Sequence, residues 1–331
     1  MKKFFNILFG ILISFSFIYI IARKIDLKEV FFHIKNINVT YIILFIITII
    51  LSYILKSYRG LFLTFNERIS LKKILTFSKG ISISMFLNNI LPMRSGDLIR
   101  AFFISKSYDI KKTFMIGTIV IERIFDILTL LILLSFFLLI TTRIDIPLFV
   151  RNLSSLGLVI FCLIFFILIY FKKYKGIIIR KFNRLHDIKF FKKLTKFLNS
   201  ILDGFFVLDK SNHVFRVGII SIFIWLLESF SFFLIGKALY LNLTFLPYIF
   251  IMAIVCFGTL LPSGPAFIGV FEGGCIFALA MLGIDAEISM AFAVVFHFLK
   301  LGIVSVFGLF FIFKEKIDVI KDLKDLKNQF F

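Results

Sequence analysis

Long apolar runs alternate with short polar segments along this chain. Six of the runs have the apolar character expected of a membrane-spanning helix, which needs about twenty residues to cross the hydrocarbon core. We predict spans at residues 4–22, 41–55, 114–140, 153–171, 217–234 and 289–313. The pattern is therefore typical of an all-α integral membrane protein with about six full transmembrane helices.

Two further apolar regions, 80–104 and 249–282, are interrupted near their middle. The first contains Leu-Pro-Met-Arg-Ser-Gly-Asp at 91–97, and the second contains Leu-Pro-Ser-Gly-Pro-Ala-Phe-Ile-Gly at 261–269. Proline removes a backbone donor and disfavours helix at the residue before it. Irregular backbone at membrane depth is tolerated only where it is buried in protein or lines a wet cavity. We therefore predict two re-entrant helical hairpins, each made of two half-helices joined by a loop.

The distribution of Lys and Arg supports this topology. With a cytoplasmic N-terminus and two re-entrant hairpins, the cytoplasmic segments contain 30 basic residues and the external segments contain 7. Twelve of the 30 lie in segment 172–216, which we interpret as amphipathic helices on the anionic cytoplasmic leaflet. A first hairpin that crossed fully would place this segment outside, against the positive-inside rule. We predict a multi-pass protein of the cytoplasmic (plasma) membrane with both termini in the cytoplasm.

The topology contains an internal repeat. In each half a span is followed by a hairpin and then by a closing span, and the two hairpins enter from opposite sides of the membrane. Such inverted repeats typically place a transport site at their interface. We predict a single membrane domain over residues 1–331, divided into a first span and outside loop (1–40), a first repeat (41–142), a span and basic cytoplasmic linker (143–216), a second repeat (217–313) and a cytoplasmic tail (314–331).

The composition argues against several other classes of protein. Apolar residues make up 60% of the chain and the net charge is +20. The basic residues flank apolar runs without any nucleic-acid-binding module, so we expect no nucleic-acid partner. The sequence has no glycine-rich phosphate loop, no metal-ligand pattern and no paired cysteine spacing. We expect no cofactor, no metal site, no soluble catalytic domain and no catalytic residue.

The first hairpin contains the first group of candidate binding residues. Ser95, Gly96 and Asp97 fit the start of a half-helix, whose free amides and positive dipole end would face the membrane interior. Asp97 and Arg100 are one turn apart and can pair with each other. Arg94 can either hold a phosphate through its planar guanidinium or pair with a nearby carboxylate and fix the loop. The candidate headgroup-binding residues here are Asn88, Asn89, Pro92, Arg94, Gly96, Asp97 and Arg100.

The second hairpin contributes a similar group. Its glycines allow the backbone to approach a ligand or another hairpin closely. Glu272 either starts the second half-helix or serves as a buried acid. The candidates in this hairpin are Pro262, Gly264, Pro265, Gly269 and Glu272.

Ionisable residues inside the spans form a third group. A charge near the bilayer centre costs about 2.5–3.5 kcal/mol, so Glu122, Arg123 and Asp126 must face the protein interior and be paired or hydrated. Their spacing places Asp126 on the same helix face as the other two residues. This predicts a charge network, whose role is either structural or functional. We assign to it Glu122, Arg123, Asp126, Glu228, His297 and Lys300.

These motifs resemble one known family. The pattern consists of Asn88-Asn89-x-x-Pro92-x-Arg94-x-Gly96-Asp97-x-x-Arg100, Glu122-Arg123-x-x-Asp126 and Pro262-x-x-Pro265-x-x-x-Gly269-x-x-Glu272. It is similar to the transmembrane region of the lysylphosphatidylglycerol synthases, a flippase-like family that includes many stand-alone proteins. Two positions depart from the family pattern: Ala266 replaces a usual glycine, and His297 stands where arginine is expected. The aminoacyl-transferring domain of the fused synthases has no counterpart here, so the resemblance implies lipid translocation rather than lysine transfer.

The resulting hypothesis is a lipid flippase or transporter for an anionic phospholipid or a polyprenyl-phosphate-linked lipid. Two alternatives remain at this point. One is a membrane-embedded glycosyl- or headgroup transferase, although the predicted outside loops are short for a donor or metal site. The other is a non-transporting partner of a cell-envelope lipid synthase or glycosyltransferase.

Overall fold

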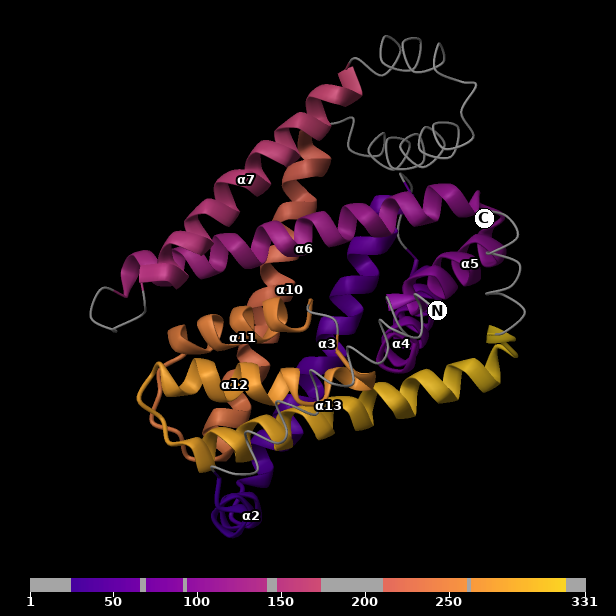
Figure 1. Ribbon diagram of the computed structural model, residues 1–331. Helices are drawn as coiled ribbons and strands as arrows, with labels where there is room; N and C mark the ends of the chain where they lie inside the picture. The colour runs from indigo at the N-terminus through magenta and orange to yellow at the C-terminus, as the bar shows by residue number, and fades with distance from the viewer. Residues whose placement is uncertain are drawn as a thin grey trace, which may run out of the picture.

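The computed structural model describes residues 25–65, 70–91, 94–141, 148–173, 211–260 and 263–319. The predicted first span, most of the basic segment 172–216, and the candidates Pro92 and Pro262 lie outside these residues. Every regular element in the described part is helical (Figure 1).

Four helices are long and apolar enough to cross a membrane, and each contains a predicted span. They are α3 (Val39–Thr64), α6 (Lys112–Ile140), α10 (Ser211–Ala238), in which the apolar stretch runs from Val214 to Ala238, and α13 (Ala286–Lys314). The predicted span at 153–171 lies within α7 (Leu148–Lys173). The described part is therefore that of an all-helical membrane protein.

Both interrupted apolar regions form pairs of packed helices. The first hairpin consists of α4 (Leu71–Ile90) and α5 (Gly96–Tyr108). The second hairpin consists of α11 (Leu246–Gly258), the short 3-10 helix η3 (Pro265–Phe267) and α12 (Val270–Ala280). The breaks lie where the sequence predicts, because the proline-containing segments cannot continue the helical hydrogen bonds. The first hairpin is longer than the predicted 80–104, since its helices run from Leu71 to Tyr108.

Left-handed backbone makes the turns between these helices possible. Arg94 has a φ of 53° in the first loop, and Ala266, Phe267 and Gly269 have φ values of 56°, 59° and 87° in the second. Only glycine adopts such values without steric cost. This explains why a glycine at the position of Ala266 would suit the loop.

The two halves pack through equivalent contacts. The opening helices α3 and α10 lie against each other, and each closing helix packs on the first helix of the other half's hairpin, α13 on α4 and α6 on α11. Figure 1 shows α6 and α13 running in opposite directions, with the first hairpin toward one end of the space between them and the second toward the other. The loops of both hairpins therefore point toward the middle of the molecule.

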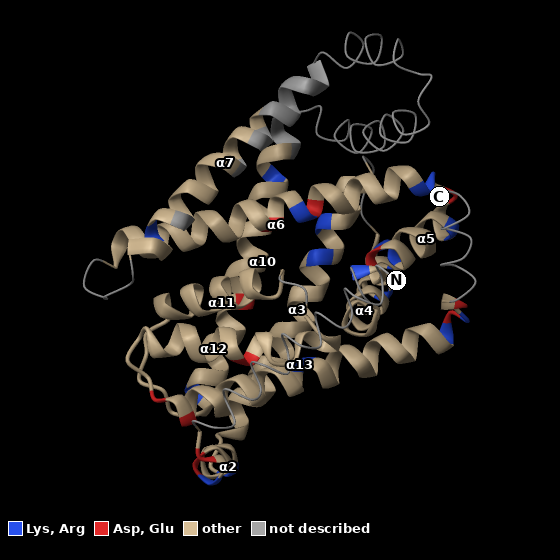
Figure 2. Ribbon diagram, viewed as in Figure 1, with Lys and Arg blue, Asp and Glu red and all other residues tan. Residues whose placement is uncertain are grey.

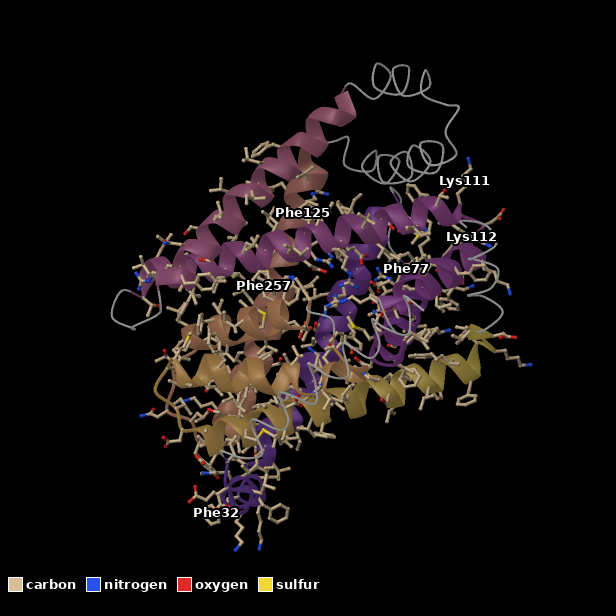
Figure 3. All side chains as sticks on the ribbon, in the orientation of Figure 1. Phe32, Phe77, Lys111, Lys112, Phe125 and Phe257 are labelled. Atoms are coloured by element: carbon tan, nitrogen blue, oxygen red, sulfur yellow. The ribbon has the colours of Figure 1, made fainter. Side chains whose placement is uncertain are left out.

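A short helix precedes α3 in the segment predicted as an outside loop. This helix, α2 (Leu27–Lys35), begins at Asp26, whose carboxylate accepts the Lys28 N–H (2.8 Å). It packs against α13. The side chain of Phe32 points away from the helical bundle, whereas Lys111 and Lys112 lie at the far end of α6 (Figure 3).

Candidate functional site

A cluster of buried and half-buried charges lies in the middle of the molecule, where α3, α6 and α10 meet the first hairpin and α13. Figure 2 shows basic residues on α3, and both basic and acidic residues in the middle of α6. The cluster comprises Lys56, Arg59, Arg94, Asp97, Arg100, Glu122, Arg123, Asp126, Glu228 and Lys300. Pairing on this scale removes the cost of placing isolated charges in a membrane interior.

Asp97 lies in the first turn of α5, which begins at Gly96 as predicted. Its carboxylate pairs with Arg123 (Nη2–Oδ2, 2.8 Å) and accepts hydrogen bonds from Ser84 (2.6 Å) and Asn88 (3.2 Å) of α4. The expected pair between Asp97 and Arg100 is wrong. The two side chains, although one turn apart, pair with different residues of α6: Asp97 with Arg123, and Arg100 with Glu122.

Glycine at position 96 allows this arrangement. A Cβ there would collide with the Ser84 carbonyl oxygen and lie 2.8 Å from the Asn88 side-chain oxygen. The start of α5 can therefore approach α4 closely enough for Asn88 to reach Asp97. Asn89 is the neighbouring half-buried residue in the last turn of α4.

Arg100 instead pairs with Glu122 (Nη2–Oε2, 2.6 Å), and both side chains are only 6% exposed. The expectation of a single cluster of Glu122, Arg123 and Asp126 therefore needs correction. Glu122 points to α5, whereas Arg123 lies between Asp97 and Asp126, the latter at 3.4 Å. Successive side chains on an α-helix point about 100° apart, so Glu122 and Arg123 face different partners.

Asp126 contacts residues that sequence reasoning missed. Arg59 of α3 donates to its carboxylate (2.7 Å) and to the hydroxyl of Ser221 (2.8 Å). The indole N–H of Trp225 also donates to Asp126 (3.0 Å). Asp126 thus joins α3, α6 and α10 at one point.

Glu228 of α10 is the second acidic centre. Its carboxylate accepts from Lys56 (2.5 Å), Lys300 (2.9 Å) and Ser52 (2.7 Å). Its side chain is 3% exposed, whereas that of Lys300 is 30% exposed. One carboxylate is therefore shared by two lysines from different halves of the molecule.

The two acidic centres are built on matching positions. Ser52 and Arg59 of α3 have the same spacing as Ser221 and Glu228 of α10, and their hydrogen bonds are reciprocal: Arg59 donates to Ser221, and Ser52 donates to Glu228. The closing helices α6 and α13 have the same length, 29 residues, and Asp126 and Lys300 occupy the same position in them. The pair Arg59–Asp126 thus corresponds to Glu228–Lys300 with the charges exchanged.

Glu272, the acidic residue of the second hairpin, is paired in a corresponding way. Glu272 accepts the Gly269 N–H (2.6 Å) at the start of α12 and contacts Nδ1 of His297 (2.6 Å). His297 occupies the position in α13 that Arg123 occupies in α6. Glu272–His297 is therefore the counterpart of Asp97–Arg123, with an imidazole in place of the guanidinium.

The loops of the two hairpins meet. The Arg94 guanidinium lies over the ring of Phe267 in η3, 5.9 Å from its centroid. Gly264 and Pro265 lie just before this ring in the same loop. Arg94 is in electrostatic range of Asp97, Arg123 and Asp126, so the first loop adds its charge to the cluster.

The signal for the missed residues was present in the sequence. Ser52, Lys56 and Arg59 recur at helical spacing on one face, and apolar residues continue beyond them to Leu63. The predicted span nevertheless ends at residue 55, because charge normally marks the membrane boundary. In the structure α3 continues to Thr64 and Arg59 is 2% exposed. Among the described residues, no group of three or more His, Cys, Asp or Glu side chains is placed to hold a metal ion.

The fold and the site define a helical membrane protein in which two broken-helix hairpins meet at a buried, charged centre. Residues 7–308 match the family model described as the lysylphosphatidylglycerol synthase TM region. This chain belongs to that family.

Two curated relatives are membrane proteins of the archaeon Methanocaldococcus jannaschii. The UPF0104 membrane protein MJ1078 is 26% identical over 249 residues, which cover 73% of this chain and the whole of that protein. The UPF0104 membrane protein MJ1595 is 33% identical over 120 residues, which cover 35% of each chain. No solved structure matches.

Proposed function

We propose that this protein moves an anionic phospholipid or a polyprenyl-phosphate-linked lipid across the cytoplasmic membrane and has no catalytic activity of its own. The observation that best supports this proposal is the meeting of the two hairpin loops at a cluster with partly exposed cations. The side chains of Arg123 and Lys300 are 31% and 30% exposed, whereas none of the paired carboxylates exceeds 13%. The accessible part of the cluster therefore offers positive charge to a phosphate.

Apolar side chains beside the two loops suit the acyl or prenyl chains of such a lipid. Ile90 and Leu98 flank the first loop and are 54% and 39% exposed. Leu260 and Ile268 flank the second loop and are similarly exposed. A lipid headgroup could reach the cations at the loops while its chains remained against these residues in the bilayer.

The architecture we propose has six transmembrane helices and two re-entrant hairpins related as inverted repeats. The matching elements and reciprocal contacts of the two halves support it. Removing the four basic residues of the cluster that were counted as cytoplasmic (Lys56, Arg59, Arg94 and Arg100) leaves 26 inside against 7 outside. The positive-inside signal therefore survives the correction.

The charged centre would also serve as the element that switches between two states. Its ion pairs join the opening helix, the closing helix and the hairpin of the first half to α10 and α13. A movement of one half against the other must exchange or separate these pairs. A rocking movement of repeats around a central site is the usual form of alternating access.

Cysteine labelling tests the topology. On a background without Cys162, Cys256 and Cys275, we expect Ser107→Cys at the base of the first hairpin to react only from the cytoplasm. Asp285→Cys at the base of the second hairpin should react only from outside, as should Asn36→Cys. All three positions are exposed. Labelling of positions 107 and 285 from the same side would contradict inverted hairpins.

Reconstitution tests the transport function. We expect the purified protein in liposomes to move at least one lipid of a fluorescent panel that includes phosphatidylglycerol and a polyprenyl phosphate, measured as loss of protection from a membrane-impermeant quencher. Arg94→Ala and Arg94→Lys should both abolish most of the movement, since lysine lacks the planar fork of arginine. Lys106→Ala, which removes an exposed cation from the same hairpin, is the matched control and should transport normally.

Three results would count against this assignment. Normal transport by Arg94→Ala would exclude Arg94 from the site. An Arg94 variant that no longer yields folded protein would favour a purely structural role for the loop. Absence of movement for every lipid in the panel would favour a partner role beside a cell-envelope lipid synthase or glycosyltransferase.

A further inference from the structure

The charged centre has more cations than carboxylates, and the excess has a definite size. The cations are Lys56, Arg59, Arg94, Arg100, Arg123 and Lys300, and the carboxylates are Asp97, Glu122, Asp126 and Glu228. Six positive charges against four negative charges leave a formal excess of two. Among the described residues, Glu272 and His297 form an ion pair only with each other, so this pair is not part of the count.

The unbalanced charges can be located. Arg100 and Glu122 form one buried pair, and Arg59 and Arg123 match the two carboxylates Asp97 and Asp126. Glu228 can neutralise only one of its two lysines. The surplus therefore lies on the Lys56–Lys300 group and on Arg94, whose described contact is an aromatic ring rather than a carboxylate.

The two surplus charges come from different halves of the molecule. Arg94 lies in the loop of the first hairpin, shortly before Asp97, and its guanidinium lies over the ring of Phe267 in the second hairpin. Lys300 lies in the closing helix of the second half. A ligand that took up both charges would thus be held between a loop of one repeat and a helix of the other.

From this arrangement we infer that the centre accepts a headgroup with two negative charges, that is, a phosphate monoester or a diphosphate. The inference rests on the proposed lipid-binding function and narrows its substrate class. A doubly charged group neutralises the surplus, a phosphodiester such as phosphatidylglycerol neutralises half of it, and a zwitterionic headgroup adds an ammonium to a positive site. Interactions between charges are strong in such surroundings because the effective dielectric constant is far below that of water.

The single tryptophan provides a direct measurement of binding. Trp225 is the only Trp of the chain, and its indole donates to Asp126 inside the cluster. Its fluorescence in the purified full-length protein can therefore be titrated with lipids of identical acyl chains in detergent micelles at about pH 8, where a phosphate monoester with a second pKa of about 6 is doubly charged. We expect phosphatidic acid to bind about tenfold or more tightly than phosphatidylglycerol, and phosphatidylcholine to bind least.

A variant of one surplus cation tests the origin of the preference. Lys300→Met leaves the Lys56–Glu228 pair intact and removes one of the two extra charges. It should reduce the advantage of phosphatidic acid over phosphatidylglycerol to about twofold or less while phosphatidylglycerol still binds. Lys106→Met, outside the cluster, should leave the advantage unchanged. Inorganic pyrophosphate distinguishes a lipid headgroup from a free phosphate: we expect weak binding, and binding as tight as phosphatidic acid would identify a water-soluble ligand of the same chemistry.

The outcomes separate this inference from the proposed function. Equal affinities for phosphatidic acid and phosphatidylglycerol would overturn the charge preference without affecting lipid transport. An undiminished preference in Lys300→Met would overturn the assignment to the surplus cations. Tight, charge-selective binding without translocation of any lipid would retain the site and overturn the transport function.

Discussion

We expect Glu228→Gln to lower the free energy of unfolding by about 3–5 kcal/mol, the usual effect of removing one member of a buried ion pair. The substitution keeps the shape of the side chain but leaves Lys56 and Lys300 next to each other without a counterion. Adding Lys56→Met should recover most of the loss, because the remaining Lys300 is partly exposed. Equilibrium unfolding in mixed detergent micelles, followed by far-UV circular dichroism, measures both effects.

Glu272, the buried acidic residue of the second hairpin, provides the control. Glu272→Gln should destabilise by less than half as much as Glu228→Gln. Glu272 has a single imidazole partner, whereas Glu228 lies between two lysines. The glutamine oxygen can also still accept the Gly269 N–H. Equal losses for the two substitutions would show that unpaired lysine charge is not the cause.

The second large effect concerns Arg123. Removing it leaves Asp97 with hydrogen bonds from Ser84 and Asn88 but without its paired cation, whereas Asp126 keeps Arg59. Arg123→Met should therefore destabilise by about 2 kcal/mol, within the range for a buried group left unsatisfied, and should abolish most lipid movement. Adding Asp97→Asn should restore stability, since it removes the stranded charge and keeps the shape.

A double-mutant cycle identifies the partner of Arg123. The coupling energy of Arg123 with Asp97 should exceed its coupling with Asp126, because Arg123 donates to Asp97 at 2.8–3.1 Å and to Asp126 at 3.4 Å. Stability and translocation should be measured on the same preparations. Transport by the stable double variant Arg123→Met with Asp97→Asn would mean that this pair stabilises the fold and takes no part in lipid movement.

The sequence was a good guide to features that depend on local chemistry. Apolar runs predicted the positions of α3, α6, α10 and α13, because the bilayer requires a minimum apolar length. Proline and glycine predicted where α5 begins and where α11 ends, because they disrupt helical hydrogen bonding. The sequence also predicted that Glu122, Arg123 and Asp126 form ion pairs in the protein interior, because an unpaired charge in a membrane is costly.

Tertiary partners were less predictable. Helical spacing identifies neighbours on the same helix, so it suggested Asp97–Arg100, whereas the structure pairs Asp97 with Arg123 of another helix. A hydropathy pattern places the end of a span at its first charged residues. The predicted span therefore left out Lys56 and Arg59, which lie in the charged cluster. Both errors have one cause: the pairing that makes a buried charge tolerable comes from segments distant in sequence.

The exchange of charges between equivalent ion pairs has an electrical consequence. If the halves are inverted as proposed, the rotation that relates them reverses the component of a dipole along the membrane normal. Exchanging the positive and negative members, as between Arg59–Asp126 and Glu228–Lys300, reverses it again. The two dipole components along the normal therefore add. Moving one elementary charge through 100 mV corresponds to about 2.3 kcal/mol, so a rearrangement that separates or reorients both pairs along the normal is biased in one direction by the membrane potential. In a transporter whose halves had the same charges, the two contributions would cancel.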